Sequence, residues 1–110
     1  MTIRALVFDT FGTLVDWRSG VAREAERLLP RIDGGAFADA WRGCYQPAME
    51  AVRSGARPFV DLDVLQAESL ETLLPLFGQR DVPTPVKQDL VLAWHRLDAW
   101  PEVPAAMARL

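Results

Sequence analysis

The sequence predicts an α/β fold in which one buried strand is followed by several helices. Residues 5–8 form an unbroken run of apolar, strand-forming side chains that is too short for a helix. Such a run predicts a strand buried on both faces of a sheet. Downstream, apolar residues recur at helical spacing in one segment after another. These two patterns together indicate a mixed fold dominated by helices.

A carboxylate ends the predicted strand. Asp9 follows the apolar run directly, and Gly12, three residues later, allows a tight turn. The carboxyl end of a buried parallel strand is where open α/β sheets place their chemistry. Asp9 is therefore a candidate catalytic residue. The alternative is a plain turn or cap residue, because Asp is common after strands.

Helical periodicity defines the rest of the chain. Asp16 and Ser19 are candidate N-caps for the first helix. Gly78 is a candidate C′ residue for the third helix, and Pro104 suits the first turn of the last one. The predicted helices cover about residues 20–29, 36–53, 61–77 and 85–97, and a further helix begins near 104.

The predicted helix at 36–53 contains an irregularity beside a candidate binding residue. Pro47 removes the hydrogen bond to the carbonyl of Gly43 and crowds that turn. We therefore expect a kink just beyond Arg42. Arg42 lies on the flank of the apolar stripe, about 100° from Trp41 around the helix. A bend there could aim its guanidinium, although a solvated surface charge is the alternative.

The bulk composition limits the classes of function. The chain has 110 residues, of which 50% are hydrophobic, and a formal net charge of −3, which suits one modest globular domain. It has no basic run, which argues against nucleic acid as a partner. No stretch reads as a signal peptide or a membrane span. Cys44 is the single cysteine, so we expect a reducing compartment, the cytoplasm.

A single strand poses a physical problem. A strand buried on both faces needs neighbouring strands to pair its backbone groups. No later segment of this sequence reads as such a partner. We therefore expect the chain by itself to be catalytically incomplete, with the other strands of its sheet supplied from elsewhere.

The first motif resembles that of a known enzyme family. The run Phe8-Asp9-Thr10-Phe11-Gly12-Thr13-Leu14 resembles the first motif of the haloacid dehalogenase (HAD) superfamily. The continuation Val15-Asp16-Trp17-Arg18-Ser19 resembles the type II L-2-haloacid dehalogenases, and the likeness extends through Trp41-Arg42 and Phe59 to Glu102-Val103-Pro104. The resemblance implies a Rossmann-like α/β core with an inserted helical cap. Residues 1–15 would be the first strand and nucleophile loop, 16–100 the cap, and 101–110 the return to the core.

The same resemblance implies roles for individual residues. Asp9 would be the nucleophile, Thr13 would orient it, and Arg42 would bind the carboxylate or the departing halide of a small 2-halo acid. Trp17 and Phe59 would line the substrate pocket together with Phe11. The resemblance implies no metal and no other cofactor, and we expect a homodimer. Core packing is the alternative role for the aromatic residues.

Phe11 separates two activities within the superfamily. Phosphatases of the superfamily usually have a second Asp at this position, which protonates the leaving alkoxide. Phe11 has no proton to give, and a halide needs none because it is a weak base. This favours dehalogenation. The alternatives are a phosphatase that acts through an aspartyl-phosphate with Mg²⁺, and a helical interaction module without activity.

Overall fold

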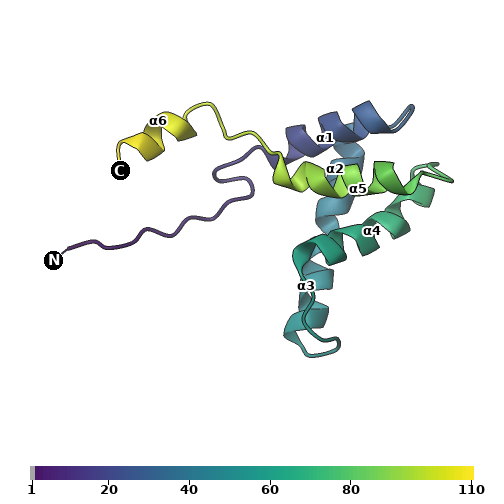
Figure 1. Ribbon diagram of the computed structural model, residues 1–110, viewed down its shortest axis with the longest axis horizontal. Coiled ribbons are helices and arrows are strands. Elements are labelled where there is room, and N and C mark those ends of the chain that lie inside the picture. The colour runs from purple at the N-terminus through teal and green to yellow at the C-terminus, as the bar shows by residue number, and fades with distance from the viewer. Residues whose placement is uncertain (1) are drawn as a thin grey trace.

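A computed structural model describes residues 2–110 and consists mainly of helices. Helices α1 to α5 gather into one cluster, while the N-terminal segment and α6 extend away from it (Figure 1). A short 3₁₀ helix, η1, continues α5. The elements are α1 (Trp17–Leu28), α2 (Gly34–Gly43), α3 (Tyr45–Arg53), α4 (Leu62–Leu76), α5 (Thr84–Leu92), η1 (Ala93–His95) and α6 (Val103–Ala108). No helix in the described part is both long and apolar enough to cross a membrane.

Capping residues set several of the helix ends. The carboxylate of Asp16 accepts a hydrogen bond from the Ser19 backbone N–H at 3.2 Å, so Asp16 is the N-cap and Ser19 lies inside α1. Asp61 caps α4 in the same way. Gly78 follows α4 with a φ of 72°, as predicted for a C′ residue. The prediction that Pro104 lies in the first turn of α6 is also confirmed.

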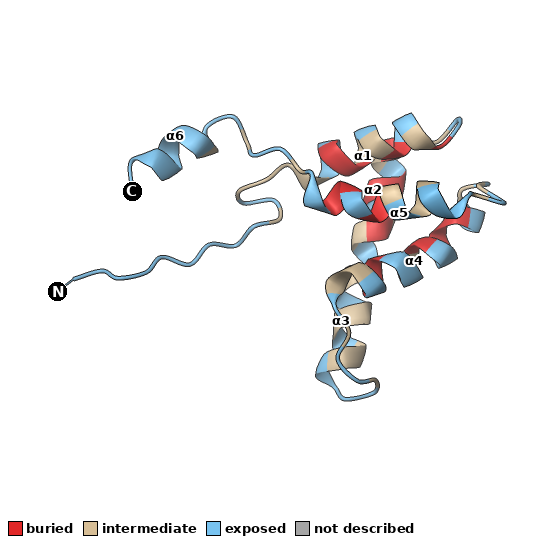
Figure 2. Cartoon of the chain, viewed as in Figure 1, coloured by how far each residue is buried: buried red, intermediate tan, exposed pale blue. Residues whose placement is uncertain are grey.

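Aromatic and aliphatic side chains from α1, α2, α4, α5 and η1 form one core, to which α3 adds no buried residue. Phe37 and Trp41 of α2 are fully buried at its centre, and the red segments of Figure 2 follow this inner side of the helices. The indole of Trp41 donates a hydrogen bond to the backbone carbonyl of Gln66 at 3.1 Å, which satisfies its polar atom inside the core. The other buried core members are Val21, Ala25, Leu29, Ala38, Leu70, Leu73, Leu74, Leu90, Val91 and Trp94.

The helix predicted over 36–53 is interrupted where a kink was expected. Helix α2 ends at Gly43, and α3 begins at Tyr45. The backbone N–H of the intervening Cys44 donates to the carbonyl of Trp41 at 3.1 Å, which tightens the last turn. Pro47 has no N–H to offer the Gly43 carbonyl, and this is the physical reason for the break. Arg42 therefore lies in the last turn before the interruption.

The predicted strand buried on both faces is not formed in the described residues. Residues 2–9 run extended but form no strand, and Val7 is 95% exposed. β-Type backbone pairing in residues 2–110 is limited to two isolated bridges, Phe11 with Val15 and Val15 with Ala99. A strand needs a neighbour to pair its N–H and C=O groups, and nothing in this part of the chain lies alongside residues 2–9 to do so.

Two other predicted helix bounds shift. The first helix starts at Trp17 and not near 20, because Asp16 is the capping residue. The helix predicted to reach residue 97 ends earlier, since α5 tightens into η1 and stops at His95. The N–H of Arg96 then donates to the carbonyl of Ala93 at 3.1 Å, a bond that closes a 3₁₀ turn. The residues after η1 are thereby free to run back past the loop that follows Asp9.

Candidate active site

The loop that carries Asp9 is a tight turn. The N–H of Gly12 donates to the carbonyl of Val15 at 3.0 Å, and the N–H of Leu14 donates to the carbonyl of Thr10 at 2.9 Å. Gly12 has a φ of 88°, a left-handed conformation that favours glycine. The turn folds the chain back on itself within a few residues, so Thr13 comes close to Asp9.

Thr13 and Asp9 form a direct pair. The Thr13 hydroxyl donates to a carboxylate oxygen of Asp9 at 2.6 Å. Such a short distance is typical of a hydroxyl bound to an ionised acceptor. The bond fixes one oxygen of Asp9 and leaves the other free to act. Asp9 itself is exposed, so a reactant can approach it.

Arg42 lies among aromatic rings. Its guanidinium carbon is 4.3 Å from the centre of the Tyr45 ring, 5.6 Å from that of Phe11 and 5.8 Å from that of Trp17. These are cation–π distances. Within residues 2–110 the side chain of Arg42 makes no ion pair and no hydrogen bond to a protein group. Its N–H donors are therefore available to an anionic ligand.

Phe11 is held in place by the core. Its ring meets Trp94 edge to face at a centroid distance of 5.8 Å, and Trp94 stacks on Trp17 at 6.2 Å. Phe11 contributes to a small pocket of about 360 Å³ at the edge of the helical cluster. The pocket is lined by Phe11, Asp61, Leu62, Asp63, Trp94 and His95. Phe11 is thus a rigid apolar wall that follows Asp9 by two residues.

The structure gathers most of the predicted site residues, but not all of them. Asp9 and Thr13 pair directly, while Phe11 and Trp17 both contact Arg42. Phe59, in contrast, is 82% exposed in the connection between α3 and α4. Its predicted role in lining the pocket with Trp17 finds no support in this arrangement.

Two residues near these groups carried no predicted role. Tyr45 makes the closest cation–π contact of Arg42, and its place three residues further along a helix was the available signal. Trp100 donates its indole N–H to the carbonyl of Gly12 at 2.9 Å. No sequence pattern could reveal this second contact, because it joins residues 88 positions apart.

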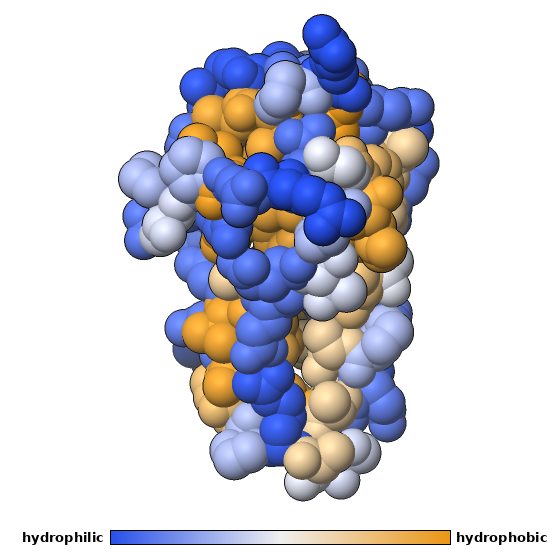
Figure 3. Space-filling model, turned by 90° about the vertical axis from the view of Figure 1, so that its right-hand side faces the viewer, coloured by the Kyte–Doolittle hydropathy of each residue, from blue (hydrophilic) through white to orange (hydrophobic). Residues whose placement is uncertain are grey.

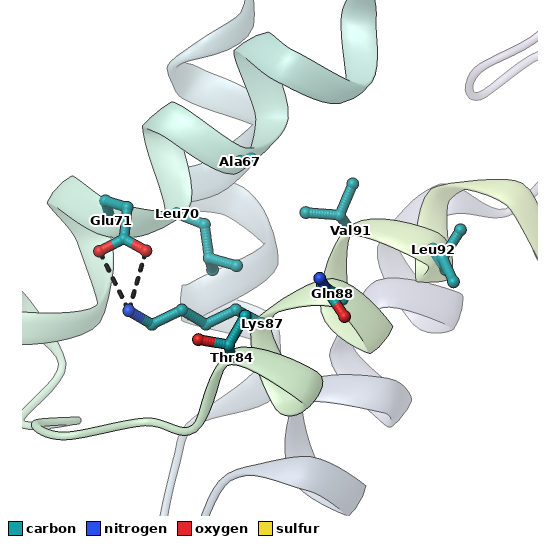
Figure 4. Close-up of a pocket in the computed structure, with 8 residues that line it drawn as sticks. All are labelled: Ala67, Leu70, Glu71, Thr84, Lys87, Gln88, Val91 and Leu92. Carbon is teal, nitrogen blue, oxygen red and sulfur yellow. Dashed lines mark hydrogen bonds and ion pairs between the residues drawn. The ribbon is translucent and has the colours of Figure 1, made fainter.

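A larger groove lies elsewhere on the molecule, between α4 and α5. It has a volume of about 480 Å³ and is mostly apolar, with an ion pair between Lys87 and Glu71 across it (Figure 4). None of the predicted site residues lines this groove.

The known proteins that this chain is similar to are L-2-haloacid dehalogenases. No family model matches the chain. A curated relative, (S)-2-haloacid dehalogenase 1 from Pseudomonas sp. (strain CBS-3), is 31% identical over an alignment of 111 positions that covers 98% of this chain and 46% of the relative. The chain resembles the L-2-haloacid dehalogenases. The resemblance inferred from the sequence motifs is thereby confirmed.

Solved structures of L-2-haloacid dehalogenases share the fold of this chain. The defluorinating L-2-haloacid dehalogenase Rha0230 matches with a TM-score of 0.79 and 44% identity, over 86% of this chain and 41% of that one. The L-2-haloacid dehalogenase PA0810 matches with a TM-score of 0.82 and 40% identity, over 93% and 44%.

A third similar structure is named for its bound ligand. It is the L-2-haloacid dehalogenase from Xanthobacter autotrophicus with chloropropionic acid covalently bound, with a TM-score of 0.73 and 25% identity. The match covers 90% of this chain and 39% of that one. The chain thus spans less than half the length of each of these dehalogenases.

Proposed function

We propose that the whole protein containing this chain is a hydrolase that removes halide from short L-2-halo acids. One observation carries the proposal: the guanidinium of Arg42, which has no carboxylate partner within residues 2–110, lies against the Phe11 ring, two residues after Asp9. This combination offers a nucleophile, an apolar wall and a free cation. A 2-halo acid presents the matching groups, which are an electrophilic carbon, an apolar substituent and a carboxylate.

The reaction proceeds in two displacements. A carboxylate oxygen of Asp9 attacks C2 of the substrate, the carbon–halogen bond breaks, and the halide leaves with its electron pair. Water then attacks the carboxyl carbon of the resulting ester. This step releases the 2-hydroxy acid with inverted configuration at C2, returns the Asp9 carboxylate and liberates a proton. The covalently bound chloropropionic acid of the Xanthobacter relative supports an intermediate of this kind.

The three other site residues serve this reaction without exchanging protons. Thr13 holds one oxygen of Asp9, so the second oxygen faces the substrate. Arg42 binds the substrate carboxylate or the departing halide through its guanidinium N–H groups. Phe11 cannot protonate a leaving group, which suits halide and disfavours alkoxide. This chemistry is the reason to favour dehalogenation over phosphate ester hydrolysis.

Product labelling tests the nucleophile. A single turnover of the whole protein with L-2-chloropropionate in heavy-oxygen water should label Asp9 first and the hydroxy acid only in later turnovers. Asp9→Asn should lower chloride release on the order of 10³-fold or more. Asp39→Asn is the matched control, because it also removes an exposed carboxylate, but one that pairs with Arg18 of α1 and makes no bond to Asp9 or Thr13. Solvent oxygen in the first product molecule would show that water attacks C2 directly.

Substrate choice tests the reaction class. The whole protein should release halide without added metal and cleave phosphate esters poorly with or without Mg²⁺. Cleavage of phosphate esters with Mg²⁺, together with inert halo acids, would establish the phosphatase alternative. Among residues 2–110, no group of three or more His, Cys, Asp or Glu side chains is placed to hold a metal ion. The homodimer and the cytoplasmic location stay predictions, and sedimentation and fractionation test them.

A further inference from the structure

The loop after Asp9 is fastened to a segment from the other end of the chain. The N–H of Asp16 donates to the carbonyl of Asp98 at 3.0 Å, and Val15 forms an antiparallel bridge with Ala99. The two segments lie side by side where the N-terminal segment and the chain leading to α6 leave the helical cluster (Figure 1). We refer to the contact of residues 12–16 with residues 98–100 as the clasp.

Trp100 makes two contacts in the clasp. Its indole N–H donates to the carbonyl of Gly12 at 2.9 Å, and its backbone N–H donates to the carbonyl of Leu14 at 3.1 Å. Thr13 lies between these two held residues. Its hydroxyl in turn donates to Asp9 at 2.6 Å. One residue therefore holds the peptide unit directly before the threonine that orients the candidate nucleophile, and also the peptide unit that follows Leu14.

Further contacts hold the segment that contains Trp100 against the helical cluster and limit the motion of the Gly12 peptide. Asp98 pairs with Arg23 of α1 at 3.0 Å, which ties the far side of the clasp to the helical cluster. Gly12, the acceptor of the indole bond, has a left-handed φ of 88° and gains no rigidity from a side chain of its own. A bond to its carbonyl from outside the loop therefore restricts a peptide that would otherwise rotate easily.

We propose that Trp100 is a positioning residue, which sets the geometry of the Thr13–Asp9 pair through the Gly12 carbonyl. The proposal rests on the proposed function, since it assigns Trp100 a part in the reaction of Asp9. It also links the chain leading to α6 mechanically to the nucleophile loop. A shift of residues 98–100 would move the peptides around Thr13 and thereby the orientation of Asp9.

Trp100→Phe isolates the contribution of the indole bond. It removes one N–H, keeps an aromatic ring and leaves the backbone bond to Leu14 intact. Trp41→Phe is the matched control, since it also removes an indole bond to a carbonyl, that of Gln66, but inside the core. A structural role predicts that both variants lose stability and keep their turnover. A positioning role predicts that Trp100→Phe changes turnover as well.

Two measurements decide between these outcomes. In NMR spectra of the whole protein, Trp100→Phe should shift the Gly12 carbonyl and Thr13 amide signals, while Trp41→Phe should leave them in place. In the whole protein, Trp100→Phe should lower kcat for L-2-chloropropionate about 2- to 10-fold with KM nearly unchanged, as expected for one neutral hydrogen bond. Trp41→Phe should keep kcat within about twofold of the original, well inside the effect of one hydrogen bond.

A failure of the positioning role of Trp100 can be distinguished from a failure of the proposed function. Unmoved Gly12 and Thr13 signals in Trp100→Phe would overturn the positioning role whether or not the protein is a dehalogenase. Moved signals with an unchanged kcat would overturn it too. If the whole protein releases no halide from any 2-halo acid, the proposed function is refuted, and so is a part for Trp100 in that reaction. The NMR signals would still report whether the indole holds the loop.

Discussion

The guanidinium carbon of Arg42 lies 4.3 Å from the centre of the Tyr45 ring, across the point where the helix breaks. Arg42 is in the last turn of α2, and Tyr45 is the first residue of α3. The ring therefore lies over the cation that we assign to substrate binding. Phe11 and Trp17 contact the same guanidinium from the nucleophile loop and from α1.

Loss of the Tyr45 ring should weaken the binding of halo acids. Tyr45→Leu should raise the dissociation constant of an unreactive 2-halo acid analogue about 2- to 5-fold, the effect of a half-exposed cation–π contact. Tyr45→Phe keeps the ring face and should bind nearly as well as the original. Calorimetric titration measures both. Equal weakening in the two variants would indicate that the hydroxyl matters and not the ring.

Arg42→Lys provides the reference for that series. It should lower turnover more than either Tyr45 variant, because a point charge replaces a planar fork. Near-normal kinetics in Arg42→Lys would indicate that Arg42 is a solvated surface charge and does not bind the substrate.

Removal of the Thr13 hydroxyl should slow the first displacement. Thr13→Val keeps the shape of the side chain but cannot donate to Asp9, so kcat should fall about 10- to 100-fold, as expected for a hydrogen bond to a charged group. Thr13→Ser retains a donor and should recover most of the rate. A pre-steady-state burst of halide release measures this step separately from hydrolysis of the ester. An unchanged burst rate in Thr13→Val would show that the hydroxyl does not orient Asp9.

Gly34 should resist substitution although it lies in a helix. A Cβ at this position would meet the backbone carbonyl oxygen of Ala22 in α1, which cannot move aside easily. Gly34→Ala should lower the free energy of unfolding by about 1–3 kcal/mol. Gly43→Ala is the control, since its Cβ would meet nothing within 4 Å, and it should leave the protein as stable or slightly more so. Urea unfolding of the 110-residue chain measures both. Equal stability of the two variants would show that α1 and α2 can separate at little cost.

Acid should weaken the contact between α1 and α5. The hydrogen bond from Arg27 lowers the pKa of Asp89 below its ordinary value of 3.8, and the charge of Arg96 adds to this effect. A lowered folded-state pKa means that the contribution to stability is present above pH 3.8 and is lost as the pH falls through the folded value. Asp89→Asn should therefore lower the urea midpoint at pH 7 and have a smaller effect near pH 3.

A second carboxylate controls that experiment. Asp81 makes no ion pair within residues 2–110, so Asp81→Asn should shift the urea midpoint little at either pH. An effect of Asp89→Asn that is equally large at both values would mean that its charge is not responsible.

The extended N-terminal segment should cause self-association of this polypeptide. Ile3 is 74% exposed and Val7 is 95% exposed in a segment with unpaired backbone groups, and such edges pair with other chains. The helical part adds to this tendency, because hydrophobic atoms also gather in patches on the face shown in Figure 3. The average mass in sedimentation should rise with concentration, and Val7→Lys should reduce the rise more than the exposed helical change Gln46→Lys. A monodisperse, fully active monomer would refute this prediction.

Much of the helical part could be predicted from the sequence, because the determinants are local. Asp61 precedes an apolar run and caps α4, and Gly78 ends the same helix with the left-handed φ predicted for it. The break after Arg42 followed from Pro47 and its missing N–H. The strand predicted at 5–8 is not formed in the described residues, because strand formation is not local. It depends on a neighbour, and residues 2–110 contain none for it.

The sequence by itself determined the residue types of the site and their order. It placed Asp9 at the end of an apolar run, Gly12 at a tight turn, and Phe11 at the position where phosphatases of the resembled superfamily usually have an acid. These are properties of short segments, and their chemistry can be inferred without coordinates. The tertiary structure decided which distant groups meet. It brought Trp100 to Gly12 across 88 positions and left Phe59 exposed. Such contacts depend on how whole helices pack, and no local spacing in the chain encodes that packing.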